Sequence, residues 1–145
     1  MIHKISLRVN AHATEDEYRV KKALELFLPQ DKIIEKSVVY GHFGNPIKIF
    51  QVELKKKNEW KYFIDFIKEK LNKEDLFNLN QEIADRVDND CNFYLRFDKQ
   101  SAYKGEVKLS DSGDSIAVRI KIASYPAKRD KAIDIAKKLL KNEIL

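Results

Sequence analysis

Apolar and polar side chains alternate one by one through Lys4-Ile5-Ser6-Leu7-Arg8-Val9-Asn10-Ala11. Successive side chains of a β-strand point to opposite faces, so this period predicts a strand with one buried and one solvent-facing side. The same alternation returns in residues 93–97, 107–109 and 116–122. A sheet of such strands needs helices on its apolar side only, which predicts a two-layer α+β sandwich with an open polar face.

Helical spacing of apolar residues predicts the elements that cover the apolar side. One helix follows a capping-box pattern at Thr14 and Glu17 and ends before Pro29, and two amphipathic stripes occupy residues 60–71 and 76–87. A last helix starts at Pro126. The glycine-rich stretch 41–46 separates two β-rich runs, which predicts an antiparallel hairpin. The expected order is βαββααβββα, a mostly antiparallel sheet in a single domain spanning residues 1–145.

Positive charge is segregated along the chain, which carries a net charge of +5. Residues 1–91 hold 16 basic and 16 acidic side chains, whereas residues 92–129 hold 8 basic and 4 acidic ones. A basic surface attracts polyanions such as RNA. The alternative is that abundant Lys and Glu serve solubility or heat stability, but solubility alone does not separate the signs.

The chain has one cysteine, Cys91, and its first ten residues lack the apolar core of a secretory signal. No apolar stretch approaches the roughly 20 residues that a membrane-spanning helix needs. These features predict a cytoplasmic protein without a membrane partner. No nucleotide loop, close metal-ligand pair or nucleophile motif is present, so we expect no cofactor, no metal and no catalytic residue.

Alternation places a basic set on the open face, provided that its strands share one sheet. That set contains an aromatic ring, on which an unpaired base can stack, among cations that can neutralise phosphates. Its members are Lys4, Arg8, Tyr94, Arg96, Lys108, Arg119 and Lys121.

A second candidate is the stretch Arg96–Gly105, where a strand is expected to run into a loop rich in basic, amide and aromatic groups. Within it we expect RNA contacts from Lys99, Gln100, Tyr103 and Lys104. The alternative is that the lysines are ordinary solvated charges and that Tyr103 belongs to the edge of the core.

Weaker candidates lie elsewhere. His42 and Asn45, in the glycine turn, are kept as RNA-contacting candidates, although a simple hairpin turn explains them as well. The acidic group Asp85, Asp88 and Asp90 has the composition of a Mg²⁺ site, but helix capping explains it better.

Three motifs together resemble the archaeal RNA-binding proteins described as predicted exosome subunits. They are His12-Ala13-Thr14-Glu15-Asp16, Gly41-His42-Phe43-Gly44-Asn45-Pro46-Ile47 and Arg96-Phe97-Asp98-Lys99-Gln100-Ser101-Ala102-Tyr103-Lys104-Gly105. The resemblance covers roughly three quarters of the chain. It implies a fold like the ribosomal protein that carries 5S RNA, an archaeal source and a role beside the exosome.

The leading hypothesis is a non-catalytic RNA-binding protein that assists RNA processing or degradation, with the exosome or ribosome-associated proteins as partners. One alternative is a protein-interaction subunit that pairs with a neighbour or forms a homodimer through an exposed sheet edge. The other is a metal-dependent nuclease centred on Asp85, Asp88 and Asp90.

Overall fold

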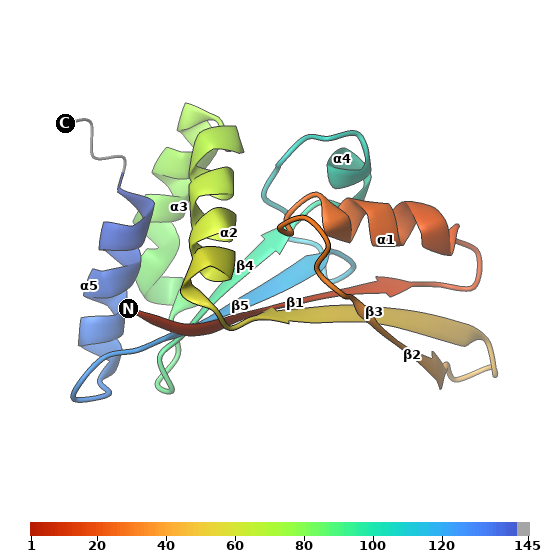
Figure 1. The fold of residues 1–145 in the computed structure, drawn as a ribbon, viewed down its shortest axis with the longest axis horizontal. Helices are drawn as coiled ribbons and strands as arrows, with labels where there is room; N and C mark the ends of the chain where they lie inside the picture. Colours follow the sequence, from red (N-terminus) through yellow and green to blue (C-terminus); the bar gives the residue numbers. More distant parts are fainter. Residues whose placement is uncertain (142–145) are drawn as a thin grey trace.

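The computed structural model describes residues 1–141 and has the expected α+β architecture. Five strands form one sheet with helices on one side of it (Figure 1). The elements in chain order are β1 (Ile2–Ala11), α1 (Glu17–Glu25), β2 (Glu35–Tyr40), β3 (Pro46–Leu54), α2 (Lys57–Lys70), α3 (Lys73–Arg86), β4 (Asn92–Phe97), α4 (Lys99–Tyr103), β5 (Ile116–Ile122) and α5 (Arg129–Leu140). Within residues 1–141, no helix is long and apolar enough to cross a membrane.

The sheet has the order β2-β3-β1-β5-β4, and every neighbouring pair is antiparallel. This order was not predictable from the alternation. The long β1 lies at the centre, where Leu7 is opposite both Val52 of β3 and Val118 of β5. Because these three side chains are buried, the register places the apolar halves of the central strands on the same face.

The core fills the space between this face and the helices. Phe27, Phe63 and Phe97 are fully buried, with ring centroids of Phe27 and Phe97 4.9 Å apart. Aromatic pairs at this spacing contribute about 0.5–1.5 kcal/mol beyond the burial of their area. Figure 1 shows α1 and the short α4 over one end of the sheet and α2, α3 and α5 over the other end.

Two expected boundaries differ from the structure. Asp16, rather than Thr14, caps α1 by accepting a hydrogen bond from the backbone N–H of Tyr18. The last helix begins at Arg129, three residues after Pro126. Arg129 donates through Nε to the carbonyl of Val87 at 2.9 Å and through Nη2 to the carbonyl of Ala84. These two bonds satisfy carbonyls at the C-terminal end of α3.

The strand expected at residues 107–109 is wrong, because Leu109 forms only an isolated bridge with Phe97. The loop expected after Phe97 is likewise wrong, because α4 forms there. Asp98 caps this helix by accepting from the backbone N–H and the hydroxyl of Ser101 at 2.9 and 2.7 Å. The hydroxyl and N–H of Ser101 lower the pKa of Asp98 below its ordinary value.

Candidate nucleic-acid interface

The open face of the sheet collects basic side chains from its central and β4 strands. Tyr94 lies opposite Arg119, which lies opposite Ser6 of β1. In the next row, Arg96 and Arg8 flank Ala117. Lys4 and Lys121 form a further opposed pair. Six of the seven residues expected on the open face therefore share it.

Lys108 is the exception. It lies between α4 and β5, outside the five strands, and its ammonium contacts Glu106 at 3.3 Å. The expectation that it stands on the sheet fails because its predicted strand does not form.

A groove of about 780 Å³ runs across this open face. Its central floor is formed by the small side chains of Ser6 and Ala117, and the larger arginines surround them. The β2–β3 side of the groove adds Gln51 and Glu53, and the segment around Lys32 closes that side. The sheet therefore offers a hollow with one arginine-rich half rather than a flat surface. Its remaining lining residues include Tyr94, Arg96, Arg8 and Arg119.

The cations of this face differ in how many hydrogen bonds and ion pairs they make within the protein. The guanidinium of Arg96 donates to the carbonyl of Gly113 at 3.2 Å and to the hydroxyl of Ser115 at 3.3 Å. Within residues 1–141, Arg8 and Arg119 have no hydrogen-bond or ion-pair partner, although both are exposed. Two uncommitted guanidinium groups beside a groove provide donors with the geometry that phosphate oxygens accept.

The lysines and carboxylates around the groove largely neutralise one another. Glu53 contacts Lys4 at 3.3 Å and Lys55 at 3.4 Å. Lys32 contacts Glu59 at 2.6 Å, and this ammonium lowers the pKa of Glu59 despite the opposing effect of burial. The groove lining holds three lysines and three carboxylates, so its excess of formal positive charge equals its three arginines.

Tyr94 is held in place by the turn that precedes β4. Its hydroxyl donates to Asp88 Oδ2 at 2.8 Å, and this bond raises the pKa of Tyr94 above its ordinary value. Burial alone would raise the pKa of Asp88. The hydrogen bonds that its carboxylate accepts from the Asn92 backbone, the Tyr94 hydroxyl and the Asn92 side chain outweigh burial, so the pKa of Asp88 is lowered. Tyr94 remains 42% exposed, so a base can stack on a ring whose hydroxyl is already held by Asp88.

We expect Asp88→Ala to destabilise the fold by about 1–2 kcal/mol, since it removes the acceptor of two backbone N–H groups and of the Tyr94 hydroxyl. Chemical denaturation measures this loss. The matched control is Asp85→Ala, which changes an exposed carboxylate on α3 and should stay within about 0.5 kcal/mol of the wild type. Equal losses in both variants would contradict the role assigned to Asp88.

Lys99 is not placed to contact RNA, in contrast to the sequence-based expectation. Its side chain is only 8% exposed, and its ammonium donates to three acceptors. These are the backbone carbonyl of Asn10 at 2.9 Å, Glu15 at 3.0 Å and Asp114 at 2.9 Å. An ammonium has three donors, so Lys99 has none left for a phosphate.

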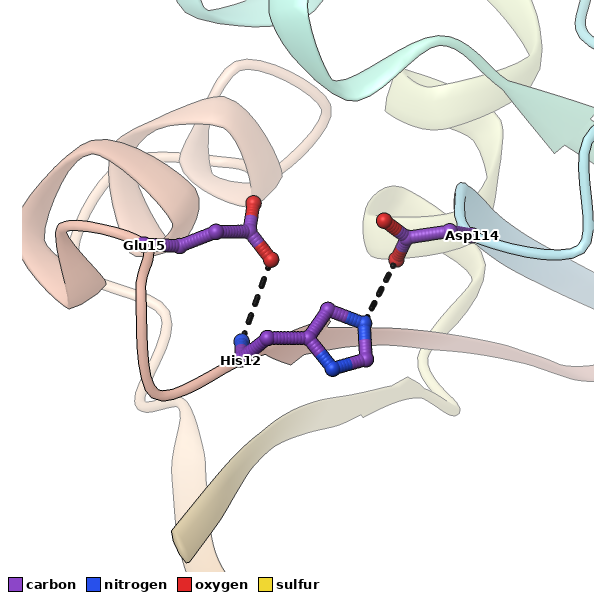
Figure 2. A group of neighbouring side chains, drawn as sticks. All are labelled: His12, Glu15 and Asp114. Atoms are coloured by element: carbon purple, nitrogen blue, oxygen red, sulfur yellow. Dashed lines mark hydrogen bonds and ion pairs between the residues drawn. The ribbon is translucent and has the colours of Figure 1, made fainter. Parts of the chain in front are cut away.

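The same cluster contains a histidine (Figure 2). His12 Nε2 lies 3.3 Å from Asp114 Oδ1, and the backbone N–H of His12 donates to Glu15 at 3.0 Å. Within the described part of the chain, His12, Glu15 and Asp114 are the group with the proximity that a metal site requires. Lys99 places a positive charge between the two carboxylates, so the donor set already has its cation and does not favour a metal.

The other candidates lie apart from the groove. Gln100 and Lys104 are exposed at α4, which packs against α1 in the helix layer (Figure 1). The guanidinium of Arg19 lies 5.4 Å from the centre of the Tyr103 ring. His42 and Asn45 are exposed in the β2–β3 turn, where the N–H of Gly41 donates to the carbonyl of Asn45 at 2.8 Å. The structure thus separates the expected site into three surfaces.

Of the residues that line the groove, sequence reasoning named Arg8, Tyr94, Arg96 and Arg119, and the ones that it missed include Ser6, Ala117 and Gln51. Ser6 and Ala117 were overlooked because they carry no charge or ring, although the same alternation that identified Arg8 and Arg119 places them between these residues. Gln51 lies opposite Arg8 in β3, and only the strand register reveals this.

Comparison with known proteins identifies relatives across nearly the whole chain. The model of a family described as RNA binding matches residues 4–122. The RNA-binding protein PAB1135 of Pyrococcus abyssi is 38% identical over 146 residues, covering 97% of this chain and 95% of that protein. The crystal structure of protein AF2318 from Archaeoglobus fulgidus has a TM-score of 0.87 and 36% identity, covering 96% of this chain and 99% of the other. Mth689 from Methanothermobacter thermautotrophicus has a TM-score of 0.82 and 33% identity, covering 97% and 99%. The chain therefore belongs to the RNA-binding family.

Proposed function

We propose that this protein binds RNA in the groove of its open sheet face. The observation that carries the proposal is the pair of exposed arginines, Arg8 and Arg119, which have no partner within residues 1–141 and flank a groove with Tyr94 beside it. The guanidinium groups bind phosphates, and the restrained tyrosine ring stacks on a base. Membership of the RNA-binding family supports the same ligand.

The affinity for RNA is expected to fall steeply with salt, because each neutralised phosphate releases bound counterions. Arg119→Ala should weaken binding roughly tenfold at low salt and reduce the salt slope by about one. Fluorescence anisotropy of a labelled RNA, titrated at several salt concentrations, measures both quantities. Lys137→Ala removes an exposed cation from α5 and serves as the matched control. Equal effects of the two substitutions would point to charge in general and away from the groove.

We also propose that the protein acts without catalysis, as an accessory factor in RNA processing or degradation beside the exosome. Asp88 supports this proposal, because its carboxylate accepts bonds from Asp90, Asn92 and Tyr94 and is committed to the turn. Incubation of labelled RNA with the protein and Mg²⁺ should leave the RNA intact. Cleavage that Asp88→Asn abolishes would favour the nuclease alternative. Affinity capture with exosome subunits, with and without ribonuclease treatment, tests the partner.

A further inference from the structure

The two edges of the sheet are treated differently. The edge of β4 is covered: Leu109 bridges Phe97, the N–H of Ser110 donates to the carbonyl of Arg96 at 2.9 Å, and Val87 bridges Phe93. β2 is the strand at the other edge of the sheet, and within residues 1–141 no segment pairs with its outer side. An uncovered edge is a template for a further strand unless charge, proline or a bulge blocks it.

The backbone groups on this edge can be assigned from the hairpin register. The N–H of Gly41 bonds to Asn45, so hydrogen-bonded and non-bonded pairs alternate along β2 and β3 from that point. Tyr40 is opposite Pro46, which has no N–H, in agreement with a non-bonded pair. Lys36, Val38 and Tyr40 therefore direct their backbone N–H and C=O groups outward.

The second half of β2 and both of its flanks carry exposed apolar side chains, whereas its first half carries Glu35 and Lys36. All six residues of β2 are exposed, and Val38, Val39 and Tyr40 follow one another without an intervening charge. Two further apolar side chains flank the strand, Ile33 at 83% and Phe43 at 88% exposed. The exposed apolar surface therefore extends beyond both ends of β2.

We propose that β2 pairs antiparallel with β2 of a second copy of this chain, about a twofold axis at Val38. Because the axis passes through Val38, the two residues of each pair lie equally far from Val38 in sequence, one before it and one after it. Val38 then faces Val38 of the second copy, and Lys36 faces Tyr40. The same register brings Ile33 toward Phe43, the two most exposed side chains flanking the strand. No like charges are opposed, so the edge is complementary to itself.

This arrangement goes beyond RNA binding by one molecule. A twofold axis perpendicular to the sheet keeps both open faces on the same side, which joins two five-stranded sheets into one continuous layer. Ile33 also lines the groove, so Phe43 of the second copy would border it.

The test is the mass in solution over a range of protein concentrations, measured by sedimentation equilibrium. We expect about 34 kDa, twice the 17.0 kDa of the chain. Val38→Lys and Val38→Glu should each return the mass to that of one chain, because each opposes like charges at the axis. An equimolar mixture of the two variants should restore the dimer, because Lys and Glu then face each other. Phe77→Lys, an equivalent change on exposed α3, should leave the dimer intact.

Hydrogen exchange gives a second readout that also shows which variants are folded. The amides of Lys36, Val38 and Tyr40 should be protected in the dimer and exchange rapidly in the Val38→Lys monomer, whereas core amides of β1 stay protected in both. A wild-type chain that remains a monomer overturns the proposal, and so does a dimer that survives Val38→Lys. Failure of the mixed variants to pair overturns it as well. The anisotropy titrations test RNA binding by the groove independently of the dimer.

Discussion

Lys99→Met is expected to lower the free energy of unfolding by about 2–3 kcal/mol at neutral pH. Methionine nearly fills the volume of the lysine, but it leaves Glu15, Asp114 and the Asn10 carbonyl without their shared donor. The two carboxylates then repel each other across the space that the ammonium occupied. The loss corresponds to roughly 5–10 °C in the melting temperature of a domain of this size. Chemical denaturation and thermal unfolding measure it.

The pH dependence of this loss distinguishes ion pairing from packing. Burial alone would raise the pKa of Asp114, but Lys99 and then His12 outweigh it, so its pKa lies below the ordinary 3.8. A lowered pKa contributes stability above the unfolded value, and that contribution disappears as pH falls through the folded value. The difference between wild type and Lys99→Met should therefore shrink below about pH 4.

Lys104→Met is the matched control for Lys99→Met, because Lys104 is exposed one residue beyond α4. Its unfolding free energy should stay within about 0.5 kcal/mol of the wild type at every pH. A loss in Lys99→Met that stays constant as pH falls would assign the effect to packing and contradict the ion-pair explanation.

The second large effect concerns RNA. Replacing both Arg8 and Arg119 with Glu is expected to weaken RNA binding roughly 100-fold or more at low salt, which corresponds to about 3 kcal/mol. Each substitution removes a guanidinium from the groove and adds a charge that repels phosphate. Both side chains are exposed, so the fold should tolerate the change. Anisotropy titration measures the affinity, and circular dichroism checks the fold.

A reversal of equal charge elsewhere controls for the overall potential. Lys137 and Lys138 of α5 are exposed, and replacing both with Glu changes the net charge by the same amount. We expect less than a threefold change in RNA affinity from this control at moderate salt, because charges beyond a Debye length of about 10 Å are screened. Comparable losses in the two double variants would remove the groove as the binding surface.

The fold was predictable to the extent that one local pattern decided it. Alternation in the strands identified the two faces of the sheet, and it placed Arg8, Tyr94, Arg96, Arg119 and Lys121 together on the open one. The strand order was not predictable, because it depends on which distant strands pair with β1. The strand expected at residues 107–109 did not form beyond a single bridge.

The candidate site was predicted less well, because residue type does not reveal burial. Lys99 has the composition of a phosphate ligand, yet tertiary contacts with Glu15 and Asp114 bury its ammonium. Those acceptors lie 84 and 15 residues away in the chain, so no local pattern predicts them. Tyr103 and Lys104 were expected to contact RNA from a loop after the strand that ends at Phe97, but this segment forms α4, which packs on α1 in the helix layer. Whether these two residues touch RNA stays a prediction.

The central position of β1 has a consequence for how the protein forms during synthesis. Of the five strands of the sheet β1 is made first, yet one of its two neighbours is β5, the last of the five to be made. A nascent chain that ends before residue 116 has an apolar central strand with one side unpaired. Non-local pairing of this kind slows folding and prolongs exposure to aggregation. Completion of the sheet must therefore await synthesis through residue 122, and a chaperone would have its greatest benefit in that interval.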